Sequence, residues 1–190
     1  MFPSMITNME IDQLIRSEKF RVFHEKIRVE MKLDNMNYEI LVEDFVKDKE
    51  GYFDSSINAR MKINKEWDRI DALVFFKDGL RTSINSNYSK LPKIQFYDAV
   101  DICVNFALVH ELVHLQQFKM GRLNKDKLEA IKEIPYKDRD IEIEANSIAK
   151  EKIINGNEFN RKIINILLSN KVIDNDELQE IIKVHKMLSL

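Results

Sequence analysis

The sequence has only one cysteine, four glycines and three prolines among its 190 residues. The single cysteine, Cys103, excludes an internal disulfide framework, and its apolar neighbours predict a buried, unreactive thiol. The few glycines and prolines leave no flexible linker and no low-complexity segment. Because this length is usual for one domain, we expect residues 1–190 to form a single domain.

The sequence also lacks a long apolar run and an excess of positive charge. No stretch is long enough to span a membrane, and the first four residues do not lead into the apolar run of a signal peptide. The formal net charge is −2, and the basic residues are mixed with acidic ones. We therefore expect cytoplasmic synthesis, no membrane partner and no nucleic-acid partner.

The apolar pattern of the first part of the chain predicts a sheet with a helix packed on it. Residues 9–24 carry apolar side chains at helical spacing. Residues 26–33 and 37–45 alternate with a period of two, as half-buried strands do. Residues 56–64 supply a further strand, and the short apolar run of residues 70–76 is typical of a central strand.

From residue 91 onward the apolar spacing is helical. Helices are expected at residues 91–121, 125–133, 140–154, 157–168 and 175–188. Strands followed by helices indicate an α+β fold. We expect a mostly antiparallel sheet within about residues 1–80 and a helical subdomain over about residues 91–190.

The first of these helices contains the pattern H-E-x-x-H, which arises by chance in roughly one chain in a hundred of this length. His110 and His114 are four residues apart, so both imidazoles lie on one helix face, with Glu111 beside them. Two histidines in this arrangement are suited to hold one Zn²⁺ while a carboxylate reaches the metal's water. Pro92 suits the start of the helix and Gly121 a left-handed cap at its end.

A catalytic zinc site needs a third protein ligand, which we expect on the helix over residues 140–154. Glu142 lies beside the apolar face of that helix, so it is the favoured ligand. Asn146 follows one turn later and is placed to orient a liganding group. Glu144 is the alternative third ligand, although its projection is roughly 200° from that of Glu142.

The motif from His110 to His114, with Glu142-x-x-Ala145 on a later helix, resembles the compact gluzincin metallopeptidases. The run over residues 142–149 is similar to the corresponding helix of ImmA/IrrE-type peptidases. The pattern Tyr136-x-x-Arg139-x-x-Glu142, together with the run over residues 114–117, is similar to small phage-encoded and bacterial zincins. The resemblance covers about residues 70–155. It implies a zincin-like fold, one zinc ion bound by His110, His114 and Glu142, and Glu111 as the catalytic base.

This ligand set predicts a zinc-dependent peptidase in which Glu111 takes a proton from the attacking water and passes it to the leaving amine. Tyr136 and Arg139 lie just before Glu142 and are candidates to stabilise the oxyanion. An exposed sheet edge can bind an extended peptide or protein substrate by strand addition. We expect that edge at residues 56–64 in preference to residues 70–76.

Two other classes of function fit the same residues. One is a zincin-like protein without turnover, used as a structural or interaction component, for example in a phage particle, which would make the chain virion-associated. The other is a regulatory module that senses a ligand through the site. Peptide cleavage that disappears on Glu111→Gln separates the peptidase from both.

Overall fold

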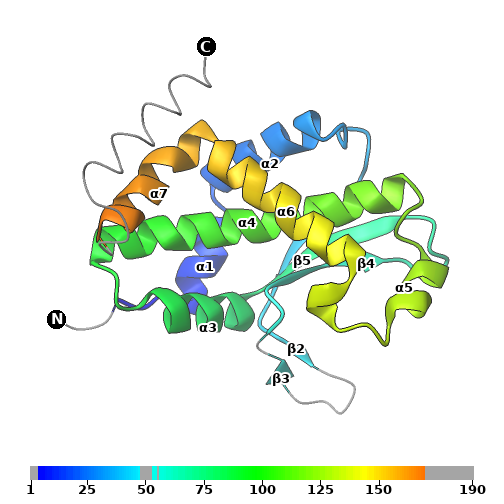
Figure 1. Cartoon of the computed structure of the whole chain (residues 1–190), viewed down its shortest axis with the longest axis horizontal. Helices are drawn as coiled ribbons and strands as arrows, with labels where there is room; N and C mark the ends of the chain where they lie inside the picture. The colour runs from blue at the N-terminus through cyan, green and yellow to red at the C-terminus, as the bar shows by residue number, and fades with distance from the viewer. Residues whose placement is uncertain (1–3, 48–52, 55, 170–190) are drawn as a thin grey trace.

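The computed structural model describes residues 4–47, 53–54 and 56–169, which form an α+β fold (Figure 1). The described helices are α1 (Asn8–Ile15), α2 (Glu18–Glu30), α3 (Lys77–Tyr88), α4 (Lys93–Lys119), α5 (Lys125–Ile131), α6 (Asp140–Asn155), α7 (Asn157–Ser169) and the short 3₁₀ helix η1 (Tyr136–Asp138). The described strands are β1 (Glu39–Glu43), β2 (Val46–Lys47), β3 (Phe53–Asp54), β4 (Ala59–Ile63) and β5 (Ile70–Phe76).

The main described sheet has the strand order β1-β5-β4. β5 is the central strand, as its apolar run predicted, and all but one of its residues are buried. It pairs parallel with β1 and antiparallel with β4, so the expectation of a mostly antiparallel sheet is wrong and the sheet is mixed. A separate ribbon pairs β2 with β3. β4, within the predicted strand at residues 56–64, is an edge strand.

The long helix α4 runs through the middle of the molecule, and α6 crosses it (Figure 1). Its start follows Pro92, as expected. Its end is a Schellman motif, in which Gly121 has a φ of 72°. The N–H of Gly121 donates to the main-chain oxygen of Phe118, and the N–H of Arg122 donates to the main-chain oxygen of Gln117. Side chains along α4 enter the main core, so the helix that carries the H-E-x-x-H pattern is fixed on several sides.

The predicted strand at residues 26–33 is wrong, because most of this segment continues α2. Phe20, Phe23 and Ile27 are all buried, and their spacing of three and four residues places them on one helix face. Ser17 caps the start of α2 through its side chain. The alternation seen from residue 26 onward is therefore part of a helical stripe, and period two over a few residues was misleading.

The division at about residue 80 is also not sharp, because α1 and α2 precede the sheet and α3 follows it directly. Residues 77–90 carry no predicted element in the sequence analysis. In α3 only Gly79, Leu80 and Ile84 are buried, so the apolar pattern that indicates a helix rests on few residues. A Cβ at Gly79 would lie 2.0 Å from the carbonyl oxygen of Ile57, so glycine permits close contact between α3 and the chain before β4.

The predicted helices after residue 91 agree with α4 to α7, while the one expected at residues 175–188 lies outside the described residues. Cys103 is partly buried against the main core, and burial raises the pKa of its thiol to about 11, which supports the expectation of an unreactive thiol. Within the described part of the chain, no helix combines the length and apolar character needed to cross a membrane.

Candidate metal centre

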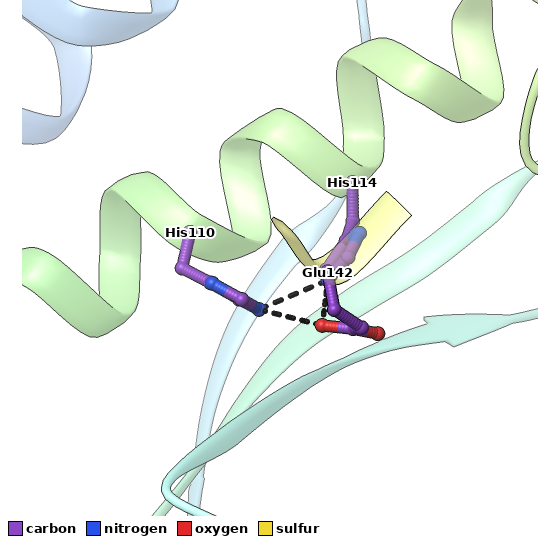
Figure 2. A group of neighbouring side chains, drawn as sticks. All are labelled: His110, His114 and Glu142. Carbon is purple, nitrogen blue, oxygen red and sulfur yellow. Dashed lines mark hydrogen bonds and ion pairs between the residues drawn. The ribbon is translucent and has the colours of Figure 1, made fainter. Parts of the chain in front are cut away.

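His110 and His114 project from one face of α4 toward Glu142, which lies in the first turn of α6 (Figure 2). The two Nε2 atoms are 3.0 Å apart. Oε2 of Glu142 lies 3.2 Å from Nε2 of His110 and 3.1 Å from Nε2 of His114. All three residues are buried. Two helices thus bring three potential ligand atoms together, although Glu142 follows His114 by 28 positions in the sequence.

The size of this triangle suits a small metal ion. Ligand atoms about 2.0–2.1 Å from a zinc ion, at the corners of a tetrahedron, lie about 3.3–3.4 Å from one another. The observed separations of 3.0, 3.1 and 3.2 Å are close to that value. Two imidazole nitrogens and one carboxylate oxygen are also the donor set of many catalytic zinc sites. His110, His114 and Glu142 therefore fit a bound metal in donor type and in spacing.

The charges within the cluster favour an ionised Glu142. Burial raises the pKa of its carboxyl, but the hydrogen bonds from His110 and His114 outweigh burial and hold that pKa well below its usual range. Burial lowers the pKa of His114, whereas the hydrogen bond with Glu142 and the charge of Glu111 raise it, and the net shift is upward. Protons and a cation would thus compete for the same atoms.

Glu111 is buried beside the triangle rather than within it. It lies on α4 next to His110, and burial raises the pKa of its carboxyl, an effect that the charges of His114 and His110 oppose. The main-chain amide of Met61, in the edge strand β4, also hydrogen-bonds this carboxyl. A carboxyl with a raised pKa beside a metal site is suited to accept a proton.

Tyr136 and Arg139 are placed differently, although the sequence suggested the same role for both. The Tyr136 hydroxyl lies 3.4 Å from Nε2 of His110 and also hydrogen-bonds Glu142, although the residue as a whole is 57% exposed. Arg139 donates instead to the main-chain oxygens of Ile134 and Lys132. Its guanidinium also lies 5.9 Å from the Tyr136 ring centroid, so Arg139 holds the segment that carries Tyr136.

The two other candidates on α6 lie away from the triangle. Glu144 forms an ion pair with Arg122, at 2.5 Å, and accepts a hydrogen bond from Gln117. Asn146, one helical turn after Glu142, is exposed, and its role in orienting a ligand stays a prediction.

The residue that hydrogen-bonds a histidine of the cluster is Gln117, to which the sequence analysis gave no role. Its Oε1 lies 2.8 Å from Nδ1 of His114. The signal available in the sequence was its spacing, since a residue three positions after His114 lies on the same side of a helix. A buried amide at that position provides the kind of support that metal-binding histidines usually have.

Comparison with known proteins identifies no relative of this chain. The chain matches no family model, no curated protein and no solved structure. The chemistry of the site therefore has to be inferred from the cluster itself. His110, His114 and Glu142 form a buried group that could hold a metal ion, and Glu111 lies next to it.

Proposed function

We propose that this protein is a zinc-dependent peptidase of the compact gluzincin type. The observation that carries the proposal is the triangle of His110, His114 and Glu142, with sides of 3.0 to 3.2 Å, together with the buried Glu111 beside it on the same helix. A structural metal site is usually closed by four protein ligands, whereas three ligands and an adjacent carboxyl favour hydrolysis.

When bound, zinc would act as a Lewis acid and lower the pKa of a water molecule toward neutrality. Glu111 would accept a proton from that water while the water oxygen attacks the carbonyl carbon of the scissile peptide bond. As the bond between this carbon and the amide nitrogen breaks, Glu111 would return the proton to the leaving amine. The Tyr136 hydroxyl, which reaches the cluster, would donate to the oxygen that becomes negatively charged.

The edge strand β4 supports binding of an extended peptide. The N–H of Phe76 donates to the carbonyl of Asn58, which makes this pair a hydrogen-bonded one in the antiparallel ladder. Because such pairs alternate, the main-chain groups of Ala59 and Met61 point away from β5. The hydrogen bond from the Met61 amide to Glu111 indicates that this side of β4 faces the candidate base. A peptide added there would lie beside the cluster.

The test combines metal analysis with a cleavage screen. Wild-type protein loaded with zinc is incubated with a peptide library, alongside Glu111→Gln, which keeps the shape of the side chain but removes the base. We expect one zinc per chain in both proteins and cleavage reduced by roughly two to four orders of magnitude in the variant.

Equal cleavage by the two proteins would contradict the role of Glu111. Zinc binding without cleavage by either protein, across the library, would instead favour a zincin-like protein with a structural or ligand-sensing role.

A further inference from the structure

Gln117 lies one turn after His114 on α4, and only 1% of it is exposed. Its Oε1 lies 2.8 Å from Nδ1 of His114. Its Nε2 is 3.0 Å from the main-chain oxygen of Ile141 and 3.0 Å from Oε2 of Glu144. Both ends of this buried amide therefore have partners, and the partners belong to both helices of the candidate metal centre.

These partners determine which end of the amide faces the imidazole. The carbonyl of Ile141 and the ionised carboxylate of Glu144 can only accept hydrogen bonds, so the NH₂ group of Gln117 must face them. The amide oxygen then faces His114, and it too can only accept. Nδ1 of His114 must therefore carry a hydrogen.

This protonation pattern leaves the other ring nitrogen available. In a neutral imidazole with its hydrogen on Nδ1, the lone pair is on Nε2. Nε2 of His114 is the atom that lies within 3.1 Å of both His110 and Glu142. Gln117 thus selects the one neutral form of His114 that can bind a metal at the centre of the triangle.

The amide also connects the helix of the histidines to the helix of the third candidate ligand. Ile141, whose carbonyl accepts from Gln117, directly precedes Glu142 in the first turn of α6. Beyond Gln117, the guanidinium of Arg122 donates to both oxygens of Glu144 at 2.8 and 2.5 Å. Arg122 follows the end of α4. By fixing Glu144, it also fixes the NH₂ end of the Gln117 side chain, which is the end that faces away from His114.

We propose that Gln117 is a positioning residue: it holds His114 with the hydrogen on Nδ1 and holds the first turn of α6 against α4, so that His114 and Glu142 are presented to the same metal ion. The ion pair between Glu144 and Arg122 fixes the amide in this orientation. The consequence for metal affinity rests on the proposed zinc site, whereas the state of the His114 ring does not.

The test compares Gln117→Met with Gln116→Met. Gln116, the preceding residue on α4, donates to the main-chain oxygen of Met31 at 3.0 Å, so its replacement removes a comparable hydrogen bond away from the cluster. The ring nitrogens of the metal-free proteins are observed by ¹⁵N NMR at a pH where the rings are neutral. Zinc affinity is measured by competition with a chromophoric chelator.

We expect wild type and Gln116→Met to show His114 with its hydrogen on Nδ1 and to bind zinc equally well. In Gln117→Met, the form with hydrogen on Nε2 should appear and zinc affinity should fall about 10- to 100-fold. An unchanged ring and unchanged affinity in Gln117→Met would overturn the proposal. If wild type binds no zinc, the metal site is wrong, but the difference in the ring spectra still decides the role of Gln117.

Gln117→Glu provides a second, opposite comparison. Its carboxylate keeps an acceptor for Nδ1 of His114 but places an oxygen against Ile141 and Glu144, so the hold on α6 is lost while the acceptor for the ring is kept. We expect a less stable fold, a hydrogen on Nδ1 of His114 as in wild type, and a smaller loss of zinc affinity than in Gln117→Met. If the form of His114 with hydrogen on Nε2 appears in Gln117→Glu as it does in Gln117→Met, the acceptor does not set the ring state, and the proposal is overturned.

Discussion

At the scale of single residues, Glu142 and Glu144 differ in what their carboxylates contact. Glu142 lies within 3.2 Å of both histidines, whereas Glu144 pairs with Arg122. We therefore expect Glu142→Ala to lose zinc at stoichiometric concentrations, and Glu144→Gln to retain it. Gln keeps an oxygen that can accept from Gln117. Elemental analysis after gel filtration measures both. Retention of zinc by Glu142→Ala together with its loss in Glu144→Gln would reverse the two roles.

The same comparison shows what the sequence could predict at this scale. Helical projection separates Glu142 from Glu144 and places two histidines on one face, because these relations depend only on local geometry. It could not predict that Asn146 is exposed or that Gln117 hydrogen-bonds His114. Both depend on the angle at which α6 crosses α4, which is set by side-chain packing between residues far apart in the sequence.

At the scale of elements, α2 is joined to the segment before β1 by a buried histidine. Nε2 of His24 lies 2.7 Å from the hydroxyl of Tyr38. Burial lowers the pKa of His24 to about 4, with the charge of Arg28 acting in the same direction and that of Glu25 opposing it. The unfolded chain therefore binds a proton at higher pH than the folded one does, so the stability from this group is present above pH 6.5 and is lost as the pH falls toward 4.

We expect this loss to reach about 3 kcal/mol at most and to be absent in His24→Gln, which does not titrate. Urea unfolding at a series of pH values measures it as the difference between the two proteins. Tyr38→Phe is the control: it removes the hydroxyl but leaves the buried imidazole, so it should keep the pH-dependent loss. A difference between wild type and His24→Gln that is constant from pH 7 to 4 would contradict the assignment.

Elements were predicted well where one apolar pattern extended over many residues, as in α4, or where a short apolar run formed a central strand, as in β5. They were predicted poorly where patterns were brief. The alternation within residues 26–33 agrees with a strand over a few positions, but Ile27 belongs to the stripe begun by Phe20 and Phe23. Strand direction could not be predicted at all, because the parallel pairing of β1 with β5 is a long-range contact.

At the scale of the whole molecule, the candidate site lies where the helix and sheet portions meet. α4 supplies His110, Glu111 and His114, α6 supplies Glu142, and β4 contacts α4 from the sheet. A metal ion bound here would link α4 to α6, and neither helix alone offers all three ligand atoms. Binding should therefore stabilise the folded state much more than the unfolded chain, in which the ligands are not held together.

This linkage gives a thermal prediction. Free zinc at about a thousand times its dissociation constant should stabilise the metal-free protein by about 4 kcal/mol. For a domain of this size, that raises the melting temperature by about 8–16 °C. His110→Ala should lose the increase, because α4 then offers only one imidazole. Glu151→Gln, an exposed change on α6, should retain it. Differential scanning calorimetry with and without zinc measures the shift in melting temperature. An equal increase in His110→Ala would mean that zinc stabilises the fold by binding at a different site.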